Sequence, residues 1–364
     1  MQMRLKWLAL AVPVSLLVAC SDQPSAPKPG DAATSVGATA SLHAAQTYTI
    51  KDLGTLGGPY AQARAINDEG WVVGVADPSV GVYHAFLWKD GRMIDLGTLG
   101  GTNSEALGIN NAGEVVGTAM LAGDAVSHAF LWSHGRMMDL GGLGGSYAEG
   151  FVINDRGDVA GGGTTPDGIF HAALFRHGRV TDLGTLGGSS SWSNGISNED
   201  VVVGGAMVAG DVAQDAFVWR DGVMHDIGTL GGTYGGASYI NGSGTVVGGS
   251  TIAGDVTTRA FIWRHGRMSD LGTPGGIYTD AYAQWINDKG QVAGGICTPD
   301  WDTSCHAVLW YNGAITDLGV LPGGYDYSWA QSINDRGQVA GYAYTATGAI
   351  RAVLWTPTPE HDHR

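Results

Sequence analysis

Short apolar runs alternate with turn residues along most of the chain from residue 47 onward. A small-residue run ends in Ile-Asn, a Val-Val-Gly run follows, and the next two runs read His-Ala-Phe-Leu-Trp and Met-x-Asp-Leu-Gly. β-Branched and aromatic residues dominate these runs, and Gly, Asn and Asp separate them, which is typical of strands joined by tight hairpins. The pattern therefore predicts short antiparallel strands rather than helices.

The four runs recur as one unit. The Asp of the Asp-Leu-Gly run, or of its variant, stands at Asp52, Asp95, Asp139, Asp182, Asp226, Asp270 and Asp317, at spacings of 43 to 47 positions. Four strands in a unit of about 44 residues match one blade of a β-propeller. Residues 47–356 are therefore predicted to form an all-β, seven-bladed propeller, with the Ile-Asn strand nearest the axis and the Asp-Leu-Gly strand outermost.

The two ends of the repeat region each carry an incomplete unit. The first unit starts with the outer strand, Tyr48 to Leu53, and the last ends with the third strand, Arg351 to Trp355. Elsewhere these two kinds of strand are joined by a tight turn, and an unpaired edge would invite aggregation. We therefore expect the N-terminal strand to pair with the last blade and close the ring.

The N-terminal residues resemble a bacterial lipoprotein signal. Arg4 and Lys6 precede an apolar run that is too short to span a bilayer, and this run ends in Leu17-Val18-Ala19-Cys20. We expect residues 1–19 to be the signal peptide, residues 20–46 to be a lipidated Cys20 with a flexible tether, and residues 357–364 to be a C-terminal tail. The resemblance implies a membrane anchor through the lipid on Cys20, in the cell envelope at the outer membrane or cell surface.

Composition and charge narrow the possible partners. The formal net charge is −15, and nucleic acid is not an expected partner because phosphate binding relies on clustered cations. The 44% hydrophobic content excludes a disordered chain, and 60 Gly without a Gly-X-Y period exclude collagen. Cys297 and Cys305 lie in one short segment of a protein expected to be exported, so we predict a disulfide. No metal site and no cofactor is expected.

The third run of the unit carries a family resemblance. His84-Ala85-Phe86 and His128-Ala129-Phe130, with the Ile-Asn-Asp-x-Gly and Asp-Leu-Gly-x-Leu-Gly-Gly motifs, resemble the HAF-repeat family of bacterial extracellular proteins over residues 47–356. The resemblance implies export and repetition, without an established biochemical activity. Asp215, Arg259 and Arg351 replace the His in other units, so this His is no obligatory ligand.

Residues that recur in every unit are interpreted as scaffold. The Asn of the Ile-Asn run suits tight turns, because Asn bonds its own backbone and tolerates positive φ. The third-strand histidines of different blades lie too far from the axis to converge on one ion, so we expect structural hydrogen bonds for His84, His128, His171 and His306. Small residues three positions before the Ile, such as Ala63 and Ala330, are expected to face a crowded axis.

Residues that differ between blades are the candidates for binding, because function commonly lies on variable loops of a rigid scaffold. The loops between second and third strands should open on the same face as the segments that cross between blades. At this mouth the candidate ligand-binding residues are Tyr60, Gln62, Tyr147, Trp192, Tyr234, Tyr278, Tyr282, Tyr325 and Trp329. Aromatic faces with nearby amides and carboxylates suit sugar rings. The alternative that these aromatics fill gaps between blades stays open.

Three functions fit these residues. The first is a surface-tethered binding module that recognises a glycan or an envelope protein at the aromatic mouth. The second is a polysaccharide-acting hydrolase or lyase, with Glu105 and Glu149 from neighbouring blades as weak catalytic candidates, since glycoside hydrolysis needs two carboxylates about 5 to 9.5 Å apart. The third is a structural envelope or assembly protein. No nucleophile or phosphate-binding motif supports an enzyme, so we prefer the first; the oligomeric state is left open.

Overall fold

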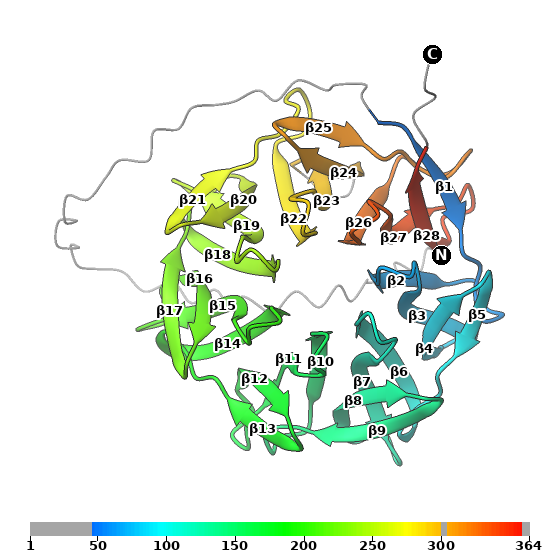
Figure 1. Cartoon of the computed structure of the whole chain (residues 1–364), viewed down its shortest axis with the longest axis horizontal. Helices are drawn as coiled ribbons and strands as arrows, with labels where there is room; N and C mark the ends of the chain where they lie inside the picture. Colours follow the sequence, from blue (N-terminus) through cyan, green and yellow to red (C-terminus); the bar gives the residue numbers. More distant parts are fainter. Residues whose placement is uncertain (1–45, 300–303, 359–364) are drawn as a thin grey trace, which may run out of the picture. The chain divides into compact units, whose positions relative to one another are not determined.

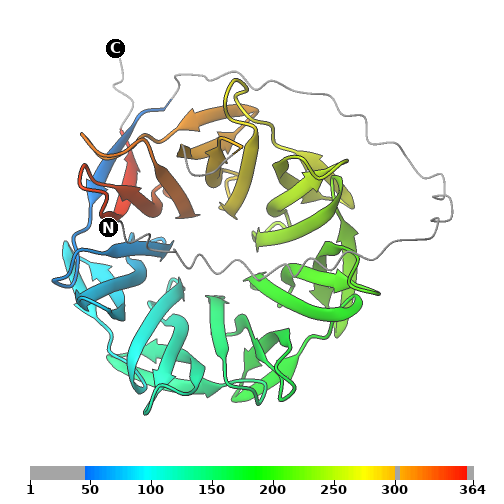
Figure 2. The same ribbon diagram turned by 180° about the vertical axis from the view of Figure 1, so that it is seen from behind.

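The structure is a computed structural model that describes residues 46–299 and 304–358. The predicted signal peptide, Cys20, nearly all of the tether and the end of the C-terminal tail lie outside the described residues. The described residues form an all-β ring of four-stranded blades around a central axis (Figure 1), and we call the region between the inner strands along this axis the channel. Figure 2 shows the same ring from its opposite face. None of the described residues forms a helix long and apolar enough to cross a membrane.

Each blade contributes one strand to each of four positions, counted outward from the channel. The innermost strands are β2 (Ala61–Ile66), β6 (Gly100–Ile109), β10 (Ala148–Ile153), β14 (Gly187–Ile196), β18 (Gly231–Ile240), β22 (Asp280–Ile286) and β26 (Ser328–Ile333). The second strands are β3 (Val72–Ser79), β7 (Val115–Leu121), β11 (Val159–Thr164), β15 (Val202–Val208), β19 (Val246–Ile252), β23 (Val292–Cys297) and β27 (Val339–Tyr344).

The third strands carry the His-Ala-Phe run or its variant. They are β4 (Val82–Lys89), β8 (Ser127–Ser133), β12 (Phe170–Arg176), β16 (Gln214–Arg220), β20 (Thr258–Arg264), β24 (Cys305–Tyr311) and β28 (Ile350–Pro357). The outermost strands are β5 (Arg92–Asp95), β9 (Arg136–Gly141), β13 (Arg179–Asp182), β17 (Val223–Gly228), β21 (Arg267–Asp270), β25 (Ala314–Asp317) and β1 (Tyr48–Asp52). The predicted order of strands from axis to rim is confirmed.

The strand pairings define seven antiparallel blades. Blades 1 to 6 are β2–β5, β6–β9, β10–β13, β14–β17, β18–β21 and β22–β25, and blade 7 is β26, β27, β28 and β1. Blades 4 and 5 are joined into one eight-stranded sheet by a single parallel pair, Gln214 with Tyr234. The predicted fold, a propeller of four-stranded units, is therefore present.

The N-terminal strand closes the ring. β1 pairs antiparallel with β28, from Tyr48 opposite Pro357 to Asp52 opposite Val353. The backbone N–H of Thr358 donates to the carbonyl of Thr47 at 2.9 Å and extends this ladder. The predicted closure is confirmed, and the last strand runs one residue beyond the expected boundary at residue 356.

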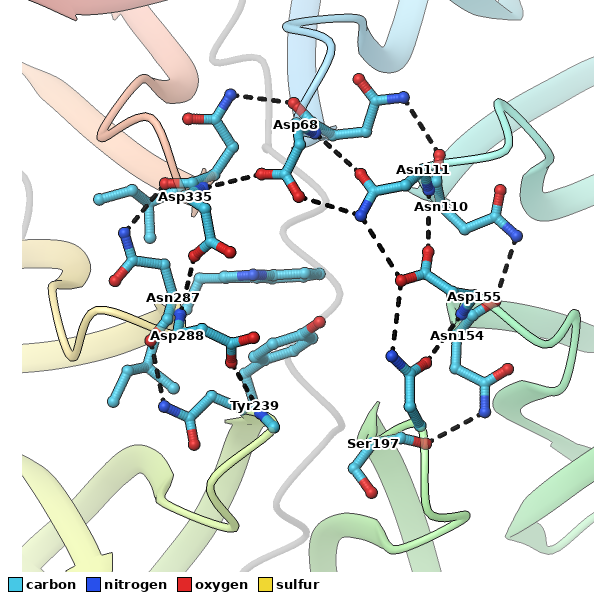
Figure 3. Close-up of a pocket in the computed structure, with 18 of the residues that line it drawn as sticks. Asp68, Asn110, Asn111, Asn154, Asp155, Ser197, Tyr239, Asn287, Asp288 and Asp335 are labelled. Atoms are coloured by element: carbon cyan, nitrogen blue, oxygen red, sulfur yellow. Dashed lines mark hydrogen bonds between the residues drawn. The ribbon is translucent and has the colours of Figure 1, made fainter.

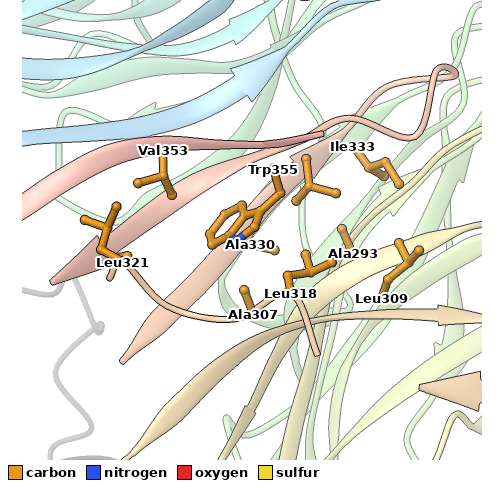
Figure 4. Packing of buried hydrophobic residues seen from close by; sticks show 11 residues of the cluster. Ala293, Ala307, Leu309, Leu318, Leu321, Ala330, Ile333, Val353 and Trp355 are labelled. Atoms are coloured by element: carbon orange, nitrogen blue, oxygen red, sulfur yellow. The ribbon is translucent and has the colours of Figure 1, made fainter. Parts of the chain in front are cut away.

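Apolar side chains are buried mainly between neighbouring blades. Figure 4 shows one such cluster, in which the fully buried Trp355 of blade 7 packs with Ala293 and Ala307 of blade 6. Ala330 belongs to this cluster, and Ala63 belongs to the corresponding cluster between blades 7 and 1. The expectation that these small residues face the axis is therefore wrong: they are small because two blades meet there.

The glycine of the Val-Val-Gly run is required by its close contact with the inner strand. A Cβ on Gly117 would lie 1.9 Å from the carbonyl oxygen of Glu105 on the inner strand, which no side chain tolerates. The pairing of β6 with β7 shifts register between Ala106 and Gly108 beside this contact, as at a β-bulge. Glycine on the second strand therefore lets the inner strand bend where its side chains reach the channel.

The predicted disulfide is present. Cys297 and Cys305 are bonded to each other, and they lie opposite one another at the ends of β23 and β24. Both residues are buried, at 1% and 0% exposure, in a small cluster with Trp329. The bond therefore joins two strands within the core of blade 6.

Candidate functional site

The propeller has two different faces. Antiparallel pairing places the crossings between blades and the loops between second and third strands on one face, which we call the crossing face. The Asn-Asp turns that join inner to second strands lie on the other, which we call the turn face. Each inner strand therefore begins at the crossing face and ends at the turn face, and its side chains line the channel between them.

On blades 1 and 3 the predicted mouth residues are bonded to each other. The hydroxyl of Tyr60 donates to the Oε1 atom of Gln62 at 2.7 Å, and the hydroxyl of Tyr147 donates to the Oε2 atom of Glu149 at 2.6 Å. Burial raises the pKa of Tyr60 to about 12. These tyrosines therefore stay protonated at neutral pH and position channel-facing polar groups.

On blades 6 and 7 several mouth aromatics are packed. Trp329 is only 7% exposed, and its ring lies where a Cβ on Gly295 of the preceding blade would come within 2.4 Å. Tyr282 covers Gly249 of blade 5 in the same way, with a distance of 2.6 Å. The geometry of these two side chains matches packing between blades, the alternative that the sequence left open.

Other mouth aromatics offer accessible surface. Tyr234 is 39% exposed and Tyr325 is 55% exposed. Trp192 is half-buried and stacks on Phe170 with ring centroids 6.5 Å apart. Tyr278 tilts against His306 at a centroid distance of 5.6 Å. Among the predicted mouth aromatics, the most exposed are therefore Tyr234 of blade 5 and Tyr325 in the crossing before blade 7.

Blades 1 to 3 place charged groups in the channel. The Nε atom of Arg64 on β2 lies 2.6 Å from the Oε1 atom of Glu105 on β6, and both side chains are less than one-third exposed. Glu149 follows on β10 and is 8% exposed. Burial raises the pKa of Glu149 to about 7, and the charge of Glu105 adds to the rise. The hydrogen bond from Tyr147 and the charge of Arg64 act against it.

Glu105 and Glu149 therefore lie on neighbouring inner strands in different surroundings. Glu105 forms an ion pair with Arg64, whereas burial raises the pKa of Glu149 to about 7. Such a difference between two carboxyl groups is what general acid and base roles require, and it also occurs in structural networks.

The third-strand histidines hold the outer strands. The Nδ1 atom of His84 lies 2.8 Å from a carboxylate oxygen of Asp95, and His128, His171 and His306 make the same pairing in their own blades. The hydrogen bond to Asp317, followed by that to Asp326, raises the pKa of His306 to about 9, although burial acts against the charged form. Among residues 46–299 and 304–358, no group of three or more His, Cys, Asp or Glu is placed to hold a metal ion.

Blade 4 lacks this pairing. Asp215 stands at the position of the histidine and faces Asp226. Burial, together with the charge and hydrogen bond of Asp226, raises the pKa of Asp215 to about 6. Two carboxyl groups thus occupy a site where blades 1, 2, 3 and 6 place a His and an Asp.

The sequence reasoning missed a hydrogen-bonded ring on the turn face. As predicted, the Oδ1 atom of Asn67 caps its own turn, accepting from the N–H groups of Glu69 and Trp71 at 3.1 and 3.0 Å. The positive φ of this turn falls on Gly70 rather than on Asn67. The Nδ2 atom of Asn67 also donates to the carbonyl of Asn110 in the next blade at 3.1 Å. Equivalent bonds leave Asn110, Asn154, Asn241, Asn287 and Asn334, and that of Asn334 returns to Asn67.

A second ring of hydrogen bonds joins the residues that directly follow each of these Asn residues, or Ser197 in blade 4. The N–H of Asp68 donates to Asn111, that of Asn111 to Asp155 and that of Asp155 to Asn198, at 2.9 to 3.0 Å. The series is interrupted between Asn198 and Gly242 and resumes with the N–H of Gly242, which donates to Asp288; the N–H of Asp288 donates to Asp335, and that of Asp335 to Asp68. Both rings surround a cavity of about 140 Å³ at the turn-face end of the channel (Figure 3).

Comparisons with known structures identify the fold alone. The β-propeller domain of the Trilobed protease from Pyrococcus furiosus matches with a TM-score of 0.55 and 12% identity, over 84% of this chain and 100% of that chain. The Pyrococcus horikoshii acylaminoacyl peptidase matches with a TM-score of 0.50 and 11% identity, over 82% of this chain and 52% of that chain. TolB from Acinetobacter baumannii matches with a TM-score of 0.45 and 11% identity, over 79% and 63%.

These similarities place the chain among β-propeller proteins. No protein-family model and no curated protein matches the sequence, so the HAF-repeat resemblance stays a prediction.

Proposed function

We propose that the protein is a binding module of the bacterial envelope, tethered through Cys20, that recognises a glycan at the crossing face. The observation that carries the proposal is the distribution of side chains around the mouth. Blades 1 to 3 supply the ion pair of Arg64 with Glu105 and the carboxyl group of Glu149, and blades 4 and 5 supply accessible rings at Trp192 and Tyr234. Aromatic faces that stack on sugar C–H groups, next to charged hydrogen-bonding groups, suit a carbohydrate.

The test is a glycan-array screen of the purified full-length protein in mild detergent, beside two matched variants. Trp192→Ala removes an accessible ring of the mouth. Trp219→Ala removes a half-buried indole from the third strand of the same blade. Binding that is lost in the first variant and kept in the second supports the proposal. Absence of any glycan signal, or equal loss in both variants, refutes a glycan site at Trp192 and leaves an envelope protein as the partner to seek by cross-linking.

The anchor has its own test. Cys20→Ala should move the protein from the membrane fraction to the soluble fraction of lysed cells and abolish its labelling by a radioactive fatty acid. Unchanged labelling in this variant would refute lipidation at Cys20.

A second function is favoured by one observation, the pKa of about 7 at Glu149 beside the carboxylate of Glu105 on the neighbouring strand. A carboxyl group that is half protonated at neutral pH can serve as a general acid, and a neighbouring carboxylate can serve as base or nucleophile. If this function holds, the protein releases reducing ends or unsaturated products from a polysaccharide. Both Glu149→Gln and Glu105→Gln must then abolish that activity, whereas Asp124→Asn on an outer loop must not.

A further inference from the structure

The cavity on the turn face is lined by all seven blades. Each blade contributes the end of its inner strand and its Asn-Asp turn, or the variant of that turn, to the wall (Figure 3). Its volume of about 140 Å³ is close to the roughly 150 Å³ of an engineered cavity that holds benzene. The cavity therefore has room for a small ligand or for the end of a long side chain.

Negative charge surrounds this cavity. Asp68, Asp155, Asp288 and Asp335 each stand in the second hydrogen-bonded ring. Burial and the carboxylates of Asp68 and Asp288 raise the pKa of Asp335, while Lys289 and the hydrogen bond from the N–H of Asp288 act against the rise. Asp335 is thus repelled by its two neighbours in the ring, Asp68 and Asp288, and a cation placed beside these carboxylates would relieve the repulsion.

Some acceptor atoms at this site are unused. The Oδ1 atoms of Asp288 and Asp335 accept the backbone bonds of the ring, from Gly242 at 2.8 Å and from Asp288 at 2.9 Å. Among the hydrogen bonds of the described residues, none reaches their Oδ2 atoms or the hydroxyl of Tyr239, which Figure 3 shows pointing into the cavity. Three oxygens of the wall therefore accept no hydrogen bond from the described residues.

An aromatic pair breaks the repeat at the same place. Tyr239 and Trp285 stand directly before the Ile of their inner strands and stack with ring centroids 3.6 Å apart. The other blades have small or aliphatic residues at this position: Ala65, Gly108, Val152, Gly195 and Ser332. Burial raises the pKa of Tyr239, and the four ring carboxylates raise it further, so the hydroxyl stays neutral. The pair presents aromatic surface to a cavity of negative potential.

We propose that this axial pocket binds a primary ammonium group carried on a short aliphatic chain. An ammonium group has three N–H donors, and the wall of this cavity carries acceptor oxygens of Tyr239, Asp288 and Asp335. A cation beside Trp or Tyr gains cation–π energy, and the carbons of a four- or five-carbon chain pack on the rings. A free amine and the side chain of a lysine in a peptide share this chemistry.

The primary experiment is calorimetric titration of the full-length protein with n-butylamine at pH 7.5 and fixed ionic strength. n-Butanol serves as the neutral analogue of equal length, and CaCl2 serves as the inorganic cation. Saturable binding of the amine with no binding of the alcohol supports the proposal. It is overturned if the alcohol binds as well, if no amine binding saturates, or if Ca²⁺ binds and the amine does not.

Matched variants locate the binding. Asp288→Asn with Asp335→Asn removes two charges, yet Asn111 and Asn198 show that Asn sustains the same ring bond. The control, Asp124→Asn with Asp211→Asn, removes two carboxylates that accept backbone N–H groups on the crossing face at 2.7 Å. We expect at least a tenfold weaker amine affinity in the first double variant and no change in the control. Equal effects in both would show that net charge alone attracts the amine, and would overturn the site.

Two further arms complete the design. If the Asp288→Asn/Asp335→Asn variant fails to fold, Tyr239→Phe removes one acceptor and keeps the aromatic ring, and an unchanged amine affinity would then refute the site.

Titration with Nα-acetyl-lysine amide distinguishes the two sources of the ammonium group. Binding as tight as that of butylamine indicates a lysine of a peptide, and much weaker binding indicates a free amine. Trp192→Ala at the crossing face should leave amine binding unchanged, so this site can fail or stand independently of the glycan proposal.

Discussion

Replacing Glu149 by Gln should stabilise the protein at alkaline pH. Glu149 is 8% exposed, and its Oε2 atom accepts the hydroxyl of Tyr147 at 2.6 Å. A Gln side chain has the same shape and retains an oxygen for that hydrogen bond, so the substitution removes chiefly the buried charge. The variant thus isolates the free-energy cost of ionising a carboxyl group inside the channel.

The size of the effect follows from the pKa of Glu149. A rise from 4.5 to about 7 on folding corresponds to about 3 kcal/mol of lost stability once the group is ionised in both states. Between these two values the folded protein holds a proton that the unfolded chain has released, so the stability of the wild type falls as the pH rises through this interval. The Gln variant lacks this fall. Its advantage should be near zero at pH 4.5 and reach about 3 kcal/mol at pH 8.

The assay is urea unfolding of both full-length proteins at several pH values from 4.5 to 8, followed by tryptophan fluorescence. Other carboxyl groups titrate in both proteins, and their contributions cancel in the difference. Glu105→Gln serves as the control, since it removes the partner of Arg64 and should destabilise the protein at pH 8. If the stability advantage of Glu149→Gln is absent at pH 8, or is the same at every pH, the account of a buried and partly protonated Glu149 is refuted.

Three further changes test other parts of the scaffold. Asp215→Asn should stabilise the protein by about 1 kcal/mol at pH 7.5, after allowance for solvent screening, and should have no effect at pH 4. The reason is that the wild type loses stability as the pH rises from 3.8 to about 6. Urea unfolding at both pH values checks this prediction. Trp329→Ala should cost about 3 to 5 kcal/mol and lower the melting temperature far more than Trp192→Ala, since only Trp329 is fully packed; equal losses would contradict this. Ser197→Asn should add the missing amide bond to the carbonyl of Asn241 and raise stability by about 0.5 to 1.5 kcal/mol in urea; a destabilised variant would show that this turn cannot accept the amide.

The closure of the ring could be predicted from the sequence because it rests on counting. Seven outer-strand motifs and two orphan strands leave one arrangement without an open edge, and the pairing of Tyr48 with Pro357 through Asp52 with Val353 confirms it. Cys297 and Cys305 could be paired for a similar reason, since a short separation within one blade left few partners. Both predictions need only the positions of the motifs and cysteines along the chain, and no knowledge of contacts between blades.

Contacts between blades were less predictable. Whether Trp329 faces the channel or the neighbouring blade depends on the space above Gly295, which stands more than thirty residues earlier in the sequence. The same holds for Ala63 and Ala330, whose small size reflects the meeting of two blades rather than crowding at the axis. A repeat pattern indicates that a residue matters to each blade, but it does not say which neighbour that residue contacts.

The Asn of each Ile-Asn turn illustrates this limit. Its role within its own turn follows from the known behaviour of Asn and is confirmed at Asn67. The bond from its Nδ2 atom to the next blade requires the curvature of the ring, which brings Asn110 alongside. A sequence signal did exist, because the blade that replaces this Asn by Ser197 is followed by one that has Gly242 in place of the next ring residue.

These departures from the repeat fall at the junction of blades 4 and 5. Ser197 has no amide to donate, and Gly242 has no side chain to accept, so both rings are interrupted there. Other bonds replace them: Asn194 donates to the carbonyl of Ala237 at 2.9 Å, and Gln214 donates to that of Gly235 at 3.2 Å. Tyr239 begins the aromatic pair on the blade that follows this junction. The departures from the repeat on the turn face therefore lie beside the aromatic pair of Tyr239 and Trp285, on which the proposed ammonium site rests.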